Sequence, residues 1–130
     1  MSVKLILVLF LLVILSYALF VSFKYYKEHY QDYALRILLV HATWCSHCER
    51  YLSSGTFDQV YNSLKKDDKY QGVVFEKIDY DQHKDIAEKY DINSFPTIIA
   101  VDANGKLLDK FSGDRDNKSD LVKFVDKNLS

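Results

Sequence analysis

The sequence predicts an α/β domain in which helices cover both faces of a mixed four-stranded sheet, with one apolar helix before this domain. Two patterns carry the prediction. Almost all of the first 23 residues are apolar, and the rest of the chain alternates between helical and strand periodicity, with a hairpin signal at Asn104-Gly105. A chain of 130 residues has room for one such core.

The N-terminal run from Leu5 to Phe23 contains no charged residue. As a helix it would be about 28 Å long, close to the hydrocarbon thickness of a bilayer, so residues 1–23 are predicted to be a transmembrane anchor. A cleavable signal peptide is the alternative, because the small residues Ser16 and Ala18 allow cleavage after Ala18. The apolar run continues beyond Ala18 and is longer than the core of a signal peptide, which favours the anchor.

The charges that flank this run bear on its orientation. Lys4 precedes it and Lys24, Lys27 and Arg36 follow it, which by the positive-inside rule weakly favours a cytosolic domain. Domains of about a hundred residues translocate largely regardless of flanking charge, and the cysteine chemistry below favours the opposite side. We therefore predict a single-pass membrane protein with its domain on the non-cytosolic side, in a periplasm or a secretory lumen.

The remaining elements follow in order. Residues 24–34 are predicted to form a juxtamembrane helix with Tyr26, Tyr30 and Tyr33 on one face, and residues 35–130 form the folded domain. Strands are expected at residues 36–42, 73–79, 97–101 and 106–111. Helices are expected from the cysteines to Ser54, from a capping Thr56 to Leu64, over residues 81–90, and around Leu121, Val122, Val125 and Leu129. This order predicts two parallel crossovers followed by one antiparallel hairpin.

Charge and cysteine content narrow the function. The chain has 17 Lys and Arg against 18 Asp and Glu, so it lacks the basic surface that nucleic-acid binding requires, and no nucleic acid is expected as a partner. Its two cysteines, Cys45 and Cys48, are too close together for a disulfide that would constrain the unfolded chain. A Cys-x-x-Cys pair is also half of a zinc site, but there is no second pair. The four histidines have no paired-ligand spacing, so no structural metal is expected; they are His29, His41, His47 and His83.

The placement of Cys45 favours redox chemistry. It stands where a helix begins, so unpaired backbone N–H groups and the positive end of the helix dipole stabilise its thiolate, while Cys48 lies one turn further on and is shielded. Cys45 is therefore the predicted nucleophile, and Cys48 resolves the mixed disulfide that it forms with a partner. The imidazole of His47 can favour the thiolate and make the pair a better oxidant; alternatively, it faces solvent without effect.

Further residues complete a pattern that resembles the thioredoxin fold over about residues 35–129. They are Trp44 before Cys45, Phe95-Pro96-Thr97 at the start of the third strand, and Gly113 after the hairpin. The resemblance implies a cis peptide bond before Pro96. It also implies that Trp44, Phe95, Pro96 and Thr97 bind the partner's chain beside Cys45.

Two branches of this family are similar to the chain. Cys-Ser-His-Cys, with Phe-Pro-Thr-Ile further on, looks like protein disulfide isomerase domains, which oxidise or shuffle disulfides. The stretch from His41 to Cys45, with Thr56-Phe57 after it, looks like membrane-tethered periplasmic thioredoxin-like proteins and the C-terminal domain of the disulfide reductase DsbD. The two branches share their chemistry and differ in the direction of electron flow.

Several positions depart from the family pattern. Thioredoxins and disulfide isomerases carry a buried acid six residues before the first cysteine, where it relays a proton to the second thiol, and here that position is Leu39. Lys77 matches the lysine that pairs with this acid and is expected to lack its partner, and Glu49 replaces a basic residue. His41 shares the strand face of Leu39. It is interpreted as buried packing, as an acid or base for the thiols, or as a copper ligand with the two cysteines.

The predicted function is a membrane-anchored thiol–disulfide oxidoreductase that exchanges disulfides with protein substrates. It needs no diffusible cofactor, and a redox partner recycles its cysteine pair. Two alternatives from other classes remain, a non-enzymatic copper or zinc carrier on the same fold and an adaptor that uses the fold only for binding.

Overall fold

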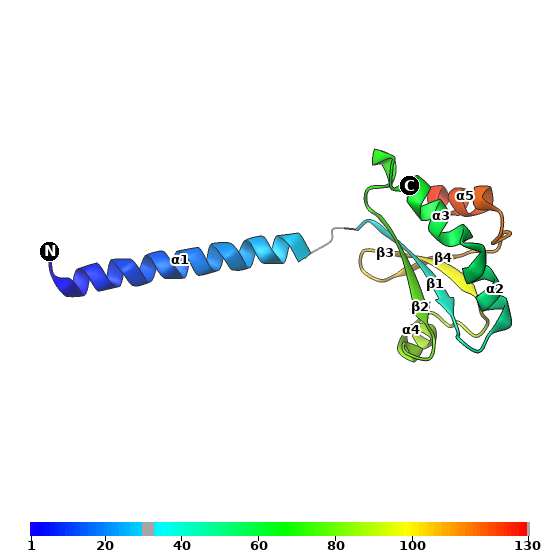
Figure 1. Cartoon of the computed structure of the whole chain (residues 1–130), viewed down its shortest axis with the longest axis horizontal. Helices are drawn as coiled ribbons and strands as arrows, with labels where there is room; N and C mark the ends of the chain where they lie inside the picture. The colour runs from blue at the N-terminus through cyan, green and yellow to red at the C-terminus, as the bar shows by residue number, and fades with distance from the viewer. Residues whose placement is uncertain (30–32, 130) are drawn as a thin grey trace. The chain divides into compact units, whose positions relative to one another are not determined.

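The computed structural model describes residues 1–29 and 33–129, and the chain divides into two compact units, Met1–Asp32 and Tyr33–Ser130. The first unit contains helix α1 (Val3–His29) (Figure 1). Its stretch Val3–Tyr25 has a mean hydropathy of 2.9, and none of that stretch is buried in the structure. This helix is long and apolar enough to cross a membrane, although a signal sequence has the same properties.

The juxtamembrane helix predicted for residues 24–34 is shorter than expected at its C-terminal end. Its first part continues α1 as far as His29, whereas Tyr33 and Ala34 are not helical. Tyr30 lies outside the described residues, and the side chain of Tyr26 is likewise not described, so the predicted aromatic stripe stays a prediction.

The second unit is built on a sheet of four strands. They are β1 (Leu35–His41), β2 (Val73–Asp79), β3 (Thr97–Asp102) and β4 (Leu107–Lys110), in the order β2-β1-β3-β4. β1 is parallel to β2 and antiparallel to β3, and β4 is antiparallel to β3. The predicted hairpin between β3 and β4 is confirmed. Gly105 adopts a φ of +77°, and its N–H donates to the carbonyl of Asp102 at 3.0 Å.

The prediction of two parallel crossovers is wrong for the second one, because β3 is antiparallel to β1. Helix α4 (Lys84–Lys89), which joins β2 to β3, has 6 residues and is about 9 Å long. A strand of 7 residues, such as β2, is about 23 Å long. Because α4 is too short to return the chain to the start of β2, β3 begins at the edge where β1 and β2 end. Thr97 is accordingly paired with Val40 near the end of β1.

Helices α2 (Ser46–Ser54), α3 (Thr56–Leu64) and α5 (Lys118–Leu129) cover one face of the sheet, and α4 covers the other (Figure 1). A short 3-10 helix (Asp68–Tyr70) follows α3. Alternate residues of β1 enter different cores: Leu39 packs under α2, α3 and α5, whereas Leu38 and Val40 pack on the side of α4. Because both faces are covered, β1 is an almost continuous apolar run.

Thr56 does not cap α3 as predicted. The N-cap position belongs to Gly55, which adopts a φ of +70° and has no side chain with which to cap the helix. The hydroxyl of Ser54, the last residue of α2, accepts a hydrogen bond from the Thr56 N–H at 3.3 Å instead. The sharp turn at Gly55 therefore lets one helix follow the other directly.

Candidate active site

The two cysteines lie at the start of α2, directly after the loop that follows β1. Cys45 is the N-cap residue of this helix, with an extended backbone (φ −95°, ψ 113°), and its sulfur accepts a hydrogen bond from the Cys48 N–H at 3.3 Å. The Cys45 thiol donates to the carbonyl oxygen of Phe95 at 3.6 Å. Both cysteines are free thiols; Cys45 is partly exposed and Cys48 is fully buried.

These surroundings affect the two thiols in opposite ways. A hydrogen bond from the Cys48 thiol lowers the pKa of Cys45 from its ordinary value, and the backbone N–H groups of Cys48 and His47 and the charge of Arg115 lower it further. Burial raises the pKa of Cys48 to about 11, and the hydrogen bond with Cys45 raises it as well. Cys45 is therefore the more acidic thiol, as its place at the start of a helix predicts, and Cys48 is the proton donor of the pair.

An aromatic surface lies beside Cys45. The Trp44 side chain is 66% exposed, and its ring meets that of Phe95 edge-on, with the ring centroids 5.8 Å apart. The Phe95 ring also contacts Tyr80, with a centroid distance of 4.8 Å. The indole N–H of Trp44 donates to a carboxylate oxygen of Asp81 at 3.4 Å. The exposed indole is thus held on two sides and is available to a partner.

The loop before β3 completes this surface. The peptide bond between Phe95 and Pro96 is cis, as the family resemblance implies, and the Pro96 ring is buried. The hydroxyl of Thr97 donates to the carbonyl of Ser94 at 2.7 Å, so its side chain holds the loop in shape. The structure therefore brings Phe95, Pro96 and Thr97 to the same end of the sheet as Cys45.

Sequence reasoning missed two residues of this site. Asp81 accepts the Trp44 hydrogen bond. It could have been found, because it follows β2 at the end of the sheet where the parallel β1 also ends. Arg115 comes from the loop before α5, and its charge lowers the pKa of both Cys45 and Cys48. No sequence signal marks it, since its position depends on how α5 packs.

The exposed side chain of His47 lines a small cavity of about 90 Å³ together with Arg50, Tyr51, Arg115 and Asp116. The contribution of His47 to the lowered pKa of Cys45 comes from its backbone N–H. Any substitution that removes this N–H therefore changes Cys45 independently of the imidazole.

The departures from the family pattern have clear structural outcomes. Leu39, in place of the acid, is fully buried in the core beneath α2, α3 and α5. Lys77 lacks the family's buried acid, as expected, because Leu39 stands in that position, and its ammonium group pairs instead with the Asp58 carboxylate at 2.5 Å. Asp58 lies in the first turn of α3, which packs against β2, so the lysine reaches a surface carboxylate. Glu49 is exposed.

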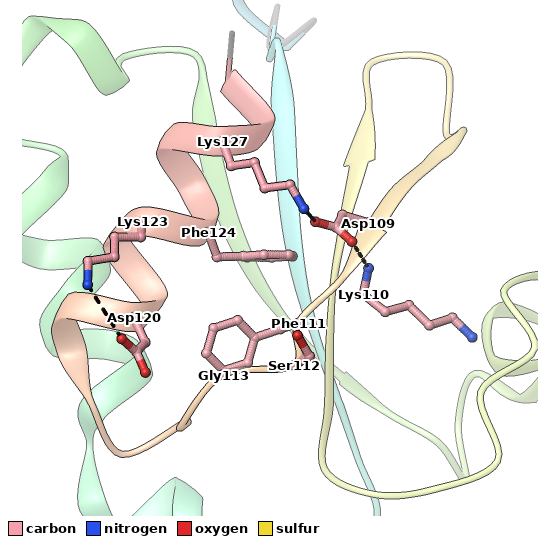
Figure 2. A pocket seen from close by; sticks show the side chains of 9 residues that line it. All are labelled: Asp109, Lys110, Phe111, Ser112, Gly113, Asp120, Lys123, Phe124 and Lys127. Atoms are coloured by element: carbon pink, nitrogen blue, oxygen red, sulfur yellow. Dashed lines mark hydrogen bonds and ion pairs between the residues drawn. The ribbon is translucent and has the colours of Figure 1, made fainter.

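Gly113 is explained by close packing. Figure 2 shows it beside Phe111, at the edge of a cavity of about 360 Å³ between the end of β4 and α5. A Cβ atom at Gly113 would lie 2.9 Å from the Phe111 ring and 3.2 Å from the Asp120 side chain. A larger residue therefore requires Phe111 or α5 to move.

Metal ligands do not gather at the site. Among the side chains that the structure describes, those of residues 1–25 and 33–129, no group of three His, Cys, Asp or Glu residues is arranged to hold an ion. The copper or zinc carrier hypothesis, which needs Cys45, Cys48 and a histidine, gains no support from this geometry.

Comparison with known proteins agrees with the fold. The sequence profile of the family described as Thioredoxin matches residues 19–127. The chain belongs to the thioredoxin family. The predicted thioredoxin fold is thereby confirmed.

Individual relatives include disulfide isomerases and thioredoxins. The chain is 33% identical to protein disulfide isomerase-like 2-2 of Oryza sativa subsp. japonica over 87 residues, which are 67% of this chain and 22% of that protein. It is 36% identical to a thioredoxin of Ictalurus punctatus over 72 residues, 55% of this chain and 61% of that protein. The chain thus spans about a fifth of the length of the disulfide isomerases that it matches.

Solved structures show the same fold. The first thioredoxin domain of mouse protein disulfide-isomerase A4 has a TM-score of 0.63 and 22% identity, over 83% of this chain and 70% of that one. Human ERp44 has a TM-score of 0.64 and 25% identity, over 77% of this chain and 29% of that one.

Proposed function

We propose that this protein is a membrane-anchored thiol–disulfide oxidoreductase that exchanges disulfides with protein substrates through Cys45 and Cys48. The observation that carries the proposal is the asymmetry of the two thiols, since Cys45 is partly exposed with a lowered pKa and Cys48 is buried with a pKa of about 11. Such a pair can attack a partner with one sulfur and resolve the mixed disulfide with the other. The names of the disulfide isomerase relatives support protein substrates.

Insulin reduction tests this activity. The full-length protein in detergent, with dithiothreitol as the electron source, should reduce insulin disulfides faster than dithiothreitol alone. Cys45→Ser should abolish the acceleration, because the attacking thiolate is lost. Cys48→Ser should accumulate a mixed disulfide between Cys45 and insulin, because the resolving thiol is lost. Serine variants that are as active as the wild type would contradict the proposal.

We assign substrate binding to the surface formed by Trp44, Phe95, Pro96 and Thr97. Its support is the exposed indole of Trp44 and the hydrogen bond that links the Cys45 thiol to the Phe95 carbonyl. An extended partner chain can lie against such a loop as an added strand. Trp44→Ala should weaken exchange with insulin and leave exchange with a small disulfide nearly unchanged. An equal loss for both substrates would contradict this assignment.

We also propose that residues 1–23 remain as the anchor, that residues 24–34 link it to the domain formed by residues 35–130, and that this domain lies on the non-cytosolic side. The length and hydropathy of Val3–Tyr25 support the anchor. Alkaline carbonate should leave the full-length chain in the membrane pellet, whereas a soluble product that begins at Leu19 would indicate a signal peptide. A membrane-impermeant thiol reagent should label Cys45 in intact cells only if the domain is outside the cytosol.

A further inference from the structure

His41, the last residue of β1, has a buried polar atom without a partner. The Nδ1 atom of its imidazole is shielded from solvent and makes no hydrogen bond within the described part of the chain. The ring as a whole is only partly buried, and it lines a cavity of about 310 Å³. Buried polar atoms are almost always hydrogen-bonded, so an unpaired ring nitrogen points to a role other than packing.

His41 and Cys48 are linked through their neighbours in sequence. The backbone of Ala42, the residue after His41, hydrogen-bonds the Cys48 thiol. On the helix side, Glu49 follows Cys48 directly and Leu52 lies one turn beyond it, and both line the cavity that His41 lines. The imidazole therefore shares a cavity with residues of α2 that follow Cys48.

We propose that His41 exchanges the proton of the Cys48 thiol, in place of the acid that relatives carry at the position of Leu39. This inference rests on the proposed function. While Cys45 is joined to a substrate sulfur, His41 accepts the Cys48 proton, and the Cys48 thiolate attacks the Cys45 sulfur. The bond between Cys45 and Cys48 forms as the bond to the substrate sulfur breaks. The substrate leaves as a thiolate and is protonated by solvent, and the imidazolium returns its proton through the cavity.

The electrons balance in this step, because the two that leave the cysteine pair are the two that reduce the substrate disulfide. The buried thiol needs such a partner, since with a pKa of about 11 only about one molecule in ten thousand carries the thiolate at pH 7. Imidazole is the side chain whose ordinary pKa lies nearest to neutral pH.

Two titratable groups on neighbouring elements lie beside His41. Glu49 on α2 lines the same cavity and is exposed, so it can pass a proton between the ring and solvent. Asp79 lies in register with His41 on β2, and one of its carboxylate oxygens already accepts the Asp81 N–H at 3.0 Å. The Glu49 carboxylate is thus an acceptor at the solvent side of the cavity for a proton that the ring releases.

A reaction with the aromatic disulfide DTNB separates the two steps in the full-length reduced protein. Attack by Cys45 releases the first coloured thiolate, and attack by Cys48 releases the second. We expect His41→Asn to slow the second release at least about tenfold near pH 7 and to leave the first unchanged. The slowing should shrink as the pH approaches the pKa of Cys48, because the thiolate then forms without a base. The same substitution at the exposed His83 is the matched control and should change neither step.

The results distinguish a failure of the role of His41 from a failure of disulfide exchange through the cysteine pair. A second release that is as fast in His41→Asn as in the wild type would overturn the role of His41, and so would equal slowing of both steps, which loss of packing produces. Wild-type protein that never releases the second thiolate would instead refute exchange through the cysteine pair. Should that variant not fold, His41→Gln takes its place. It should slow the second release alone, and a second release as fast as in the wild type would overturn the proposal.

Discussion

Iodoacetamide at pH 7 should alkylate Cys45 of the reduced protein at least about a hundredfold faster than Cys48. Only the thiolate reacts. The pKa of Cys45 lies below its ordinary value of 9.0, so more than about 1% of this thiol is ionised at pH 7, whereas a pKa of about 11 leaves about 0.01% of Cys48 ionised. The complete burial of Cys48 also keeps the reagent away, which increases the ratio further.

Both cysteines fall in one tryptic peptide, residues 37–50, so fragment ions from mass spectrometry must locate the label. The reagent is kept limiting so that the first alkylation is scored. In Cys45→Ser, Cys48 should still react slowly, because burial is the largest cause of its raised pKa. Protein unfolded in guanidinium should lose the preference. Equal or preferential labelling of Cys48 in the folded protein would refute the argument that the start of α2 activates Cys45.

Two further substitutions test single contacts. Arg115→Gln should raise the pKa of Cys45 and slow its alkylation at pH 7 about two- to fivefold, the effect of one exposed charge. The ultraviolet absorbance of the thiolate against pH measures this shift, and Arg50→Gln, in the same cavity wall, should have a smaller effect. Gly113→Ala should lower the free energy of unfolding by about 1–3 kcal/mol in urea denaturation, because its Cβ would lie 2.9 Å from Phe111. An unchanged unfolding midpoint would contradict the packing argument.

The sequence predicts those parts of the fold that depend on local patterns. The hairpin at Asn104-Gly105 can be predicted from two neighbouring residues, because its turn needs a residue that tolerates a positive φ. The buried strand β1 can be predicted because its apolar run is continuous. The direction of β3 was mispredicted because helical periodicity over residues 81–90 does not give the length of α4. In the structure the Asp79 carboxylate accepts the Asp81 N–H, so a turn occupies the first residues of that stretch.

The residues of the candidate site likewise divide into those that local sequence predicts and those that depend on tertiary packing. Cys45 at the start of α2 could be predicted from its neighbours in sequence, because the helix that follows it determines its surroundings. The pairing of Lys77 with Asp58 and the approach of Arg115 could not, because each depends on how a helix or loop distant in sequence packs. The unpaired nitrogen of His41 is likewise visible only after α2 is placed over β1.

The direction of electron flow follows from how strongly the Cys45 thiolate is stabilised, since every contribution that lowers its pKa stabilises the reduced form and makes the pair more oxidising. We propose that the His47 imidazole adds to the contributions of the helix start and Arg115. The family scale runs from about −270 mV for thioredoxin to about −180 mV for protein disulfide isomerase, an interval of about 4 kcal/mol. One partly screened imidazole can supply a fraction of that, so we expect a potential of roughly −240 to −190 mV by equilibration with glutathione.

His47→Asn, which keeps the backbone N–H, should make the potential more negative, whereas His47→Pro would also remove the N–H that lowers the pKa of Cys45. A wild-type potential at or below that of thioredoxin would favour a reductase, and an unchanged potential in His47→Asn would leave the imidazole without a redox role.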